Sequence, residues 1–420
     1  MHSLHLNIMI VILFLISSCT GPQSNVSVSA GLPSPTPFQP IKETDSDSLY
    51  AGEAPTPSYL PSMTVAPPTP AGADFPLESV AVYATVPALP LPTDLDPLTG
   101  LVPADLSLLE RRPLAIKVAN YPRYIRPQSG LTLADNIYEY YIEGGLTRFI
   151  AVFYGNTSEW VGPVRSGRFF DENIQRMYQA FLVFKFADPR VLDYFKATDF
   201  AQYLVVPTIG SCPPFRLLPT RHIEVYNNSY FYTPDWEGCV GKNGLDNSRP
   251  VIRSGFFNEL TPLSELQGME LYTYYSDYSY NHWSYSPDTH QYYRYQESDD
   301  IHDGKPEKYE PLMDRMTATA IHASNVVFLF ATHTFANTYD EEDEVYHIDL
   351  TGAGEAYVFR DGVGIVAQWH RPEKNQPLVI TAANGSLIYM RPGITFYQVL
   401  GSRSFVDQDA GEWHFHHATP

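Results

Sequence analysis

The chain has 420 residues, in which 27 Lys and Arg stand against 47 Asp and Glu, giving a formal net charge of −20. An acidic chain without clustered Lys and Arg does not fit nucleic-acid binding or charge-driven docking on an anionic membrane. Hydrophobic residues make up 44%, enough for a sizeable core, and the length predicts roughly two to three domains.

The N-terminus has the pattern of an export signal. Ile8 to Ile16 is an unbroken apolar run, which is shorter than the roughly 20 residues that a membrane-spanning helix needs. It ends in Ile16-Ser17-Ser18-Cys19, which resembles a bacterial lipobox. We therefore predict a lipoprotein signal peptide over residues 1–19, acylation of Cys19, and a lipid anchor in the cell membrane on its extracytoplasmic side. An ordinary cleaved signal peptide with an unmodified Cys19 is the alternative.

Residues 20–95 differ in composition from the rest of the chain. Of the 36 prolines, 15 lie between Thr20 and Leu95, among many Ser, Thr and Ala residues. Such a composition cannot bury a core and favours an extended, partly polyproline spacer. We predict a disordered tether there, followed by the folded part of the protein.

Strand and helix patterns alternate in residues 96–265, which predicts an N-terminal α/β domain with a mixed sheet and flanking helices. Helical spacing of apolar residues predicts one helix from Leu133 to Ile142 and another from Phe169 to Phe181. The expected strands are 114–120, 148–154, 160–164 and 182–186.

Residues 266–405 have the texture of a mostly antiparallel β domain. Nine tyrosines fall between Tyr272 and Tyr295, partly in period-two alternation, and they are either sheet packing or a surface on which sugars stack. Further strands are expected at 326–332, 346–350, 355–359, 364–369, 378–381 and 395–400, with turns between them. We predict a tail over residues 406–420, and an α+β fold class for the whole protein.

Two cysteines remain after Cys19. Cys212 and Cys239 are not spaced as a redox or zinc motif, and in an oxidising compartment they can pair as a disulfide. Two reduced thiols are the alternative.

Several motifs occur in a characteristic order in both predicted domains. They include Arg126-Pro127-Gln128-Ser129-Gly130-Leu131, Glu143-Gly144-Gly145-Leu146-Thr147-Arg148-Phe149, Gly162-Pro163-Val164-Arg165-Ser166 with Arg168, Arg360-Asp361-Gly362 and Pro392-Gly393. In this the chain resembles the YerB-like family of bacterial lipoproteins, whose members carry an N-terminal and a C-terminal domain of unknown function. The resemblance implies the fold and the location but no chemistry. Lys185-Phe186-Ala187 and Thr220-Arg221-His222 depart from the family pattern.

A weaker likeness concerns the LytR-CpsA-Psr type of envelope glycopolymer transferase. The order of Arg126, Asp135, Arg165 and Arg168 is similar to that of the arginines and acids with which those enzymes hold a polyprenyl diphosphate. The likeness implies an alternative function, a metal-assisted phosphotransferase or hydrolase acting on a lipid-linked diphosphate.

The arginines are the main candidate ligand-binding residues. Arg165 and Arg168 lie between a predicted strand and the start of a predicted helix, where guanidinium groups and free backbone N–H groups together suit phosphate or carboxylate. Arg126 and Arg148 are added as anion candidates. The alternative is local ion pairing, of Arg168 with Glu172 and of Arg165 with Asp171 or Glu139.

Asp135, Glu139 and Glu143 share one face of the predicted helix at spacings of four. They are candidate acid partners of the arginines or ligands of a divalent cation, while a solvated helix face is the alternative. His222 is a possible base or a structural histidine. His414, His416 and His417 form a terminal cluster, for which fraying or weak metal binding are the two interpretations.

Taken together, these patterns predict an extracytoplasmic lipid-anchored protein that binds an anionic cell-envelope polymer or an envelope protein. We expect no cofactor, no dedicated metal site and no nucleic-acid partner, and the sequence leaves open whether the protein is an enzyme.

Overall fold

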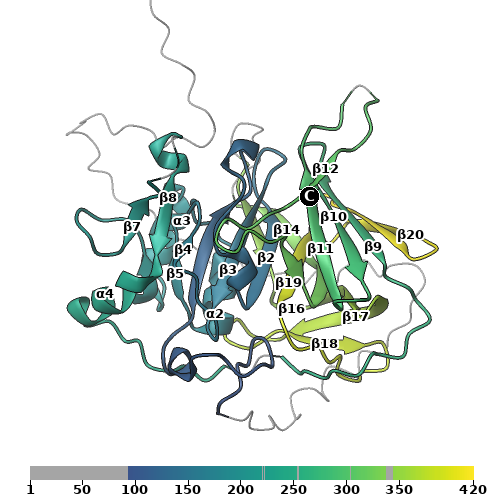
Figure 1. Cartoon of the computed structure of the whole chain (residues 1–420), viewed down its shortest axis with the longest axis horizontal. Helices are drawn as coiled ribbons and strands as arrows, with labels where there is room; N and C mark the ends of the chain where they lie inside the picture. The colour runs from purple at the N-terminus through teal and green to yellow at the C-terminus, as the bar shows by residue number, and fades with distance from the viewer. Residues whose placement is uncertain (1–92, 220, 222, 253–254, 303, 337–343) are drawn as a thin grey trace, which may run out of the picture. The chain divides into compact units, whose positions relative to one another are not determined.

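The structure is a computed structural model that describes residues 93–420 except 220, 222, 253–254, 303 and 337–343 (Figure 1). The predicted signal peptide, Cys19, the tether up to residue 92 and His222 lie outside the described residues. In the described part, the α-helices lie in the N-terminal half, and the C-terminal half consists of strands and loops. The α+β fold class is therefore confirmed. The helices are α2 (Asp171–Tyr178), α3 (Pro189–Lys196) and α4 (Trp236–Asn243).

The main sheet has eleven strands in the order β18-β17-β16-β14-β19-β2-β3-β1-β5-β6, with β15 paired to β14. Strands of both halves lie side by side in it (Figure 1), because β19 of the C-terminal half pairs in parallel with β2 of the N-terminal half. The sheet is thus continuous across the expected boundary near residue 265. Its strands are β1 (Leu114–Ala119), β2 (Asn136–Tyr141), β3 (Thr147–Phe153), β5 (Phe181–Val183), β6 (Leu204–Val205), β14 (Asn325–Phe335), β15 (Tyr346–Asp349), β16 (Gly352–Arg360), β17 (Val363–Arg371), β18 (Val379–Ala382) and β19 (Thr395–Gly401).

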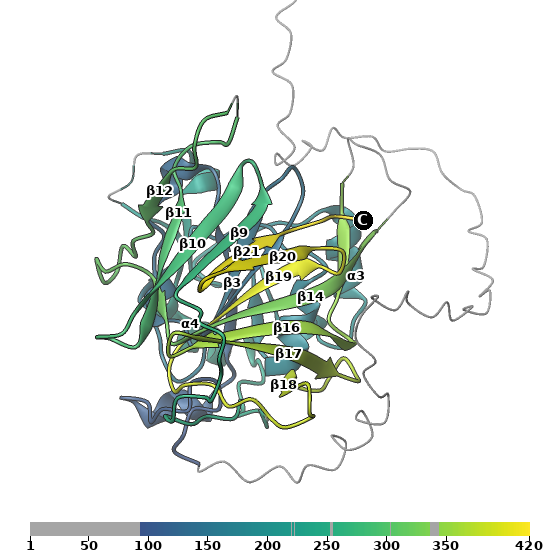
Figure 2. The same ribbon diagram turned by 90° about the vertical axis from the view of Figure 1, so that its right-hand side faces the viewer.

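A second sheet of seven strands has the order β12-β11-β10-β9-β21-β20, with β13 on β11 (Figure 2). Its inner side chains, such as Trp283 and Phe415, are buried against Phe396 and Phe328 of the main sheet, with ring centroids 4.8 and 3.6 Å apart. Its strands are β9 (Glu270–Ser276), β10 (Ser279–Ser286), β11 (Gln291–Glu297), β12 (Tyr309–Pro311), β13 (His322–Ala323), β20 (Phe405–Asp409) and β21 (Glu412–His416). A small third sheet joins β4 (Trp160–Val161), β8 (Ser229–Tyr232) and β7 (Phe215–Leu217).

Two predicted segments differ from the structure. The helix expected from Leu133 to Ile142 is strand β2, which lies between β19 and β3 and is buried on both faces. A central strand covered on both sides shows no period-two alternation, so its apolar positions also matched helical spacing. The expected tail, residues 406–420, contains β20 and β21. It is held because Trp413 and Phe415 alternate with polar residues and point into the core.

Cys212 and Cys239 are joined by a disulfide, with their Cα atoms 5.5 Å apart. It ties the loop before β7 to α4. Because the bond joins positions 27 residues apart in sequence, the predicted pairing constrains the segment from the loop before β7 to α4.

One buried ion pair connects the two sheets. The Glu139 carboxylate on β2 lies 2.8 Å from the Arg294 guanidinium on β11, and both side chains are fully buried. The guanidinium also lies over the rings of Phe149, Trp283 and Phe396, at 4.9 to 5.3 Å from their centroids. The charged pair therefore replaces hydrophobic packing at the centre of the junction.

Replacing Arg294 by Met should lower the free energy of unfolding by about 3–5 kcal/mol, because it leaves Glu139 as an uncompensated buried charge. The double variant Glu139→Leu/Arg294→Met should recover most of this loss, since a neutral pair of similar volume has no such charge. Denaturant unfolding followed by tryptophan fluorescence measures both. A single variant as stable as the parent would contradict the importance of the pair.

Candidate functional site

Neighbouring residues on β2 and β3 point to opposite faces of the main sheet. Tyr140 and Arg148 face α2, whereas Glu139 and Thr147 face the second sheet. Side chains in a strand alternate between the faces, so residues that are adjacent in sequence enter two different polar clusters. Asp135, Glu139 and Glu143, which the helix prediction placed on one face, are an even number of residues apart, so alternation does not separate them. They are apart because four residues of extended chain span about 13 Å and because only Glu139 lies within β2.

On the α2 side, Lys117 is the centre of the first cluster. Its side chain is fully buried, with Nζ 3.1 Å from Asp171 Oδ1 and in contact with the Tyr140 hydroxyl. Tyr140 in turn donates a hydrogen bond of 2.5 Å to the same carboxylate oxygen. Burial lowers the pKa of Lys117 to about 7, against the opposing effect of Asp171. This lysine is satisfied internally and lies in a strand that is otherwise apolar.

Arg148, Arg168 and Glu143 extend this cluster. Arg168 makes a bidentate contact with Glu143, its Nε donating to Oε2 at 2.8 Å, and Arg148 lies 3.9 Å from the same carboxylate. Arg168 thus forms an ion pair, as one of the two sequence interpretations expected, but its partner is not Glu172, which pairs with Arg176. The expected solvated acid face is wrong, because β2 is a buried strand.

Arg165 differs from the other arginines. It is half-buried, and one terminal nitrogen reaches the Tyr121 carbonyl at 3.5 Å. Its Nε has no hydrogen-bond partner among the residues that the structure describes. The pairing with Asp171 or Glu139 does not form, since these carboxylates are engaged with Lys117 and Arg294. Burial and the nearby Arg148 lower the pKa of Arg165 to about 10.

Aromatic side chains surround Arg165. Tyr121, Tyr124, Phe186 and Tyr226 are between 37 and 50% exposed, and the Tyr226 ring centroid lies 5.6 Å from the guanidinium carbon. Lys185 adds a second cation, because its backbone N–H donates to the Arg165 carbonyl and its ammonium lies over the Phe186 ring. We call this group the Arg165 surface; it comprises Tyr121, Tyr124, Arg165, Lys185, Phe186 and Tyr226.

Like charges oppose each other at the Arg165 surface. Burial, and after it Arg165, lower the pKa of Lys185 to about 8. A cation whose charge is destabilised by burial and by another cation is stabilised when an anion approaches. The geometry therefore suits a negatively charged ligand that also covers aromatic rings.

On the other face of the sheet, Glu139 belongs to a network that crosses between the halves. Its Oε1 accepts hydrogen bonds from Thr147 and Asn120, and its Oε2 pairs with Arg294. The chain of contacts continues through Gln296, Glu297 and Arg126 and returns to Asn120. We call this closed ring of contacts the Glu139 network; its members are Asn120, Arg126, Glu139, Thr147, Arg294, Gln296 and Glu297.

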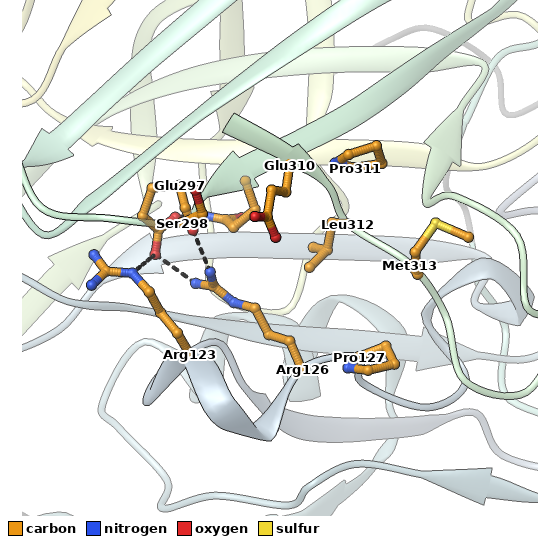
Figure 3. A pocket seen from close by; sticks show the side chains of 10 residues that line it. Arg123, Arg126, Pro127, Glu297, Ser298, Glu310, Pro311, Leu312 and Met313 are labelled. Atoms are coloured by element: carbon orange, nitrogen blue, oxygen red, sulfur yellow. Dashed lines mark hydrogen bonds and ion pairs between the residues drawn. The ribbon is translucent and has the colours of Figure 1, made fainter. Parts of the chain in front are cut away.

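A pocket of about 360 Å³ lies beside the network, between the loop after β1 and strands β11 and β12 (Figure 3). Arg126 and Arg123 both point toward the Glu297 carboxylate, at 2.5 and 3.8 Å from Oε1. Glu297 is 1% exposed, and its burial outweighs the two arginines and raises its pKa to about 7. We call it the Glu297 pocket; it is lined by Arg123, Arg126, Pro127, Gln296, Glu297, Ser298, Glu310, Pro311, Leu312 and Met313.

Asp135 lies in neither cluster. Its carboxylate accepts hydrogen bonds from the backbone N–H of Tyr154 and from the side chain of Asn156, at 2.6 Å for the latter. Burial raises its pKa and that of the neighbouring Asp96. It therefore fastens loops at the start of β2 and does not contact the arginines.

The terminal histidines lie in an ordered strand. His414 and His416 of β21 stack on Tyr272 and Tyr274 of β9, with ring centroids 4.6 and 4.8 Å apart, and His282 of β10 continues the stack. The interpretation as a frayed end is thus wrong. Because the rings cover one another's faces, this part of the tyrosine band serves sheet packing and leaves little face for a sugar.

Several functional candidates were absent from the sequence prediction, namely Lys117, Lys185, Glu297, Glu310 and the exposed tyrosines. A lysine inside the apolar run 114–119 was a usable signal for Lys117, since an unpaired lysine is almost never fully buried. Glu297 gave no signal, because its arginine partners lie more than 170 residues earlier in the chain.

Among the described residues, no group of three or more His, Cys, Asp or Glu side chains is arranged to hold a metal ion. The acids considered for that role, Asp135 and Glu139, hold loops and Arg294 instead. The alternative of a metal-assisted phosphotransferase therefore gains no support from the site.

The fold and the two clusters define a two-part α+β protein with a cationic, aromatic surface on one half and a polar junction between the halves. The chain belongs to the family described as "Protein of unknown function (DUF3048)": its N-terminal domain matches residues 98–232 and its C-terminal domain residues 271–397, together more than half of the chain.

Two relatives agree with this assignment. The chain is 25% identical over 328 residues to "Putative lipoprotein YerB" of Bacillus subtilis (strain 168), which covers 75% of this chain and 89% of the relative. Its fold is similar to the crystal structure of the YerB protein from Bacillus subtilis, with a TM-score of 0.60, 23% identity, and coverage of 73% of this chain and 96% of the other. The resemblance to the YerB-like family is thereby confirmed.

The raised pKa of Glu297 predicts a pH-dependent contribution to stability. In the unfolded chain this carboxyl has a pKa near 4.5, and in the folded protein it stays protonated up to about 7. Its stabilising contribution is therefore complete below pH 4.5 and is lost as the pH rises through 7. The difference in unfolding free energy between the parent and Glu297→Gln should fall by up to about 3 kcal/mol over this range.

Denaturant unfolding at about pH 5 and about pH 8 measures this difference. The control is Glu310→Gln, because Glu310 lines the same pocket but is exposed to solvent. The difference in unfolding free energy between the parent and this variant should be the same at both pH values. A constant difference for Glu297→Gln as well would show that Glu297 is ionised throughout.

Proposed function

We propose that the protein is a lipid-anchored protein on the extracytoplasmic side of the cell membrane that binds an anionic cell-envelope polymer through the Arg165 surface. The name of the Bacillus relative, which calls it a lipoprotein, and the pattern ending in Cys19 support the anchor. In the described part of the chain, no helix has the length and apolar character to cross a bilayer.

The observation that carries the proposal is the incomplete pairing of Arg165. Arg126, Arg148 and Arg168 are each in contact with a carboxylate, whereas Arg165 has a single long contact to a carbonyl and an unpaired Nε. Leaving a half-buried guanidinium without an acid costs free energy. A phosphate or carboxylate group provides the missing acceptor.

The exposed rings favour a polymer over a small anion. They come from three separate segments, the loop after β1, the loop after β5 and the 3-10 turn Val225–Asn227, so the surface extends well beyond one anion. At protein–protein interfaces, tyrosine and arginine are, with tryptophan, the residues that most often contribute binding energy. A polymer with repeated acidic groups can contact Arg165 and Lys185 at once and cover the rings of Tyr226 and Phe186, which lie against these two cations.

The net charge of −20 affects how such binding depends on salt. A polyanion is repelled by most of this chain and attracted by the Arg165 surface. Both effects are screened over about 10 Å at moderate ionic strength. Binding therefore requires contact with the surface and is not produced by the field of the whole protein.

Poly(glycerol phosphate) is a suitable probe for the polymer. Replacing Arg165 by Gln should weaken its binding at least about tenfold, a loss of about 1.4 kcal/mol, because the guanidinium is the main acceptor-binding group. The control Lys196→Gln removes the same charge from the exposed end of α3 and should change affinity less than about twofold. Equal affinities for the parent and Arg165→Gln would refute the site.

The anchor is tested separately. Replacing Cys19 by Ser should abolish incorporation of radiolabelled fatty acid and shift the protein from the membrane fraction to the soluble fraction, since the acyl chains provide the membrane affinity. The double variant Cys212→Ser/Cys239→Ser, which removes the disulfide without leaving a free thiol, is the control and should keep the label. Continued labelling of Cys19→Ser would contradict the lipobox assignment.

A further inference from the structure

The Glu297 pocket is a second site with properties unlike those of the Arg165 surface. Its volume of about 360 Å³ lies within the range of pockets that bind small molecules. It is built by both halves of the protein, with Arg123, Arg126 and Pro127 on one side and residues of β11, β12 and the loop after β12 on the other (Figure 3).

Some of the charges in the pocket are already paired. Arg126 donates to the carboxylate and the carbonyl of Glu297, at 2.5 and 2.6 Å, and to the carbonyl of Asn120. These contacts use most of its donors and belong to the Glu139 network. Arg126 and Glu297 therefore form the fixed floor of the pocket and are not free to bind a ligand.

Two groups of opposite charge remain incompletely paired. Arg123 donates through one terminal nitrogen to Asp300 and to the Tyr278 carbonyl. Among the described residues, its buried Nε has no hydrogen-bond partner, and it lies 3.8 Å from Glu297 Oε1, which is longer than a hydrogen bond. Among the described residues, no hydrogen bond or ion pair is formed by the Glu310 carboxylate, which is exposed on β12. A positively charged hydrogen-bond donor, Arg123, and a negatively charged acceptor, Glu310, thus line the same cavity.

The remaining wall of the pocket is mostly apolar. Besides the polar Gln296 and Ser298, Pro127, Pro311, Leu312 and Met313 line it, and Met313 is 38% exposed although it is a large hydrophobic side chain. A flexible methionine in an exposed cavity wall adapts to different apolar groups. A ligand that fits must therefore have an apolar part as well as charges.

We propose that the Glu297 pocket binds a zwitterionic ligand of the amino-acid type, either an amino acid or a dipeptide with free ends. Its carboxylate is directed to Arg123, its ammonium group to Glu310, and its apolar side chain to Leu312 and Met313. This assignment places each charge of the ligand beside the incompletely paired group of opposite sign. The fixed pair of Arg126 and Glu297 lies between them and requires no rearrangement.

Neither a simple anion nor a simple cation fits as well. An anion on Arg123 leaves Glu310 without a partner, and a cation on Glu310 leaves the Nε of Arg123 without a hydrogen bond. A charge of one sign therefore satisfies half of the site. The Glu297 pocket and the Arg165 surface share no residue and are tested with different ligands, so failure of this proposal is distinguishable from failure of the proposed function.

Calorimetric titration of the full chain in detergent, with the dipeptide Ala-Leu and its N-acetylated and C-amidated forms, tests the proposal. Ala-Leu should bind saturably, and each blocked form should bind at least about tenfold more weakly because one charge is missing. Glu310→Gln should weaken Ala-Leu binding by a similar factor without further weakening the N-acetylated form. Arg123→Gln should likewise weaken Ala-Leu binding, without further weakening the binding of the C-amidated form.

Glu307→Gln is the matched control. Glu307 lies on the same segment as Glu310, accepts a hydrogen bond from the Tyr309 hydroxyl and does not line the pocket. The Glu307→Gln variant should therefore bind Ala-Leu like the parent. The unfolding midpoint of Arg123→Gln is measured in parallel, since this variant also loses Asp300 as a partner. No saturable binding of Ala-Leu, equal binding of the blocked forms, or an unchanged affinity of Glu310→Gln would each overturn the proposal.

Discussion

The ion pair between Glu139 and Arg294 is the interaction on which the arrangement of both sites depends. It joins the central strand of the main sheet to the second sheet at full burial, where neither charge can turn to water. Such a pair contributes little net stability compared with apolar packing, but a wrong docking of the sheets leaves two buried charges unpaired. It therefore acts mainly by specifying one relative position of the two sheets, and with it the position of β11 next to the loop after β1.

That loop connects the two candidate sites. Tyr121 and Tyr124 on it belong to the Arg165 surface, while Arg123 and Arg126 line the Glu297 pocket. Arg221 holds the loop from the side of the third sheet by donating to the carbonyls of Tyr124 and Ile125. Because one short segment supplies residues to both sites, the geometry of the Arg165 surface depends on the same contacts that position the floor of the pocket.

The sequence was sufficient for local features and insufficient for long-range ones. The strands at 148–154 and 395–400 and the helix after Phe169 were predicted close to their observed positions, because their patterns are local. The β2 strand was missed because burial on both faces removed its alternation. The pairing of β19 with β2 brings together segments more than 250 residues apart, and no periodicity in a single sequence indicates such a partner.

The same distinction holds for the sites. Arg165 and Arg168 were identified from their grouping, but the sequence could not show that Glu143 satisfies Arg168 and that Arg165 remains without an acid. Glu297 and Glu310 gain significance only when the C-terminal half is docked against the loop that carries Arg123. A charged residue is a useful candidate for ligand binding when the fold gives it no complete set of partners of opposite charge. Whether it has such partners depends on segments that are distant in sequence.

In an acidic protein, the cations that the fold leaves without a carboxylate partner are the best indication of where an anion binds. A carboxylate of the protein lies against each of five cations, namely Lys117, Arg126, Arg148, Arg168 and Arg294. Their positive charges are compensated within the protein, so these side chains are poor candidates for binding an anionic ligand. Arg165 and Lys185 remain at a surface framed by exposed rings. A chain with a net charge of −20 can thus still bind a polyanion at the Arg165 surface, because two cations lie together there while the overall charge opposes contacts that do not involve them.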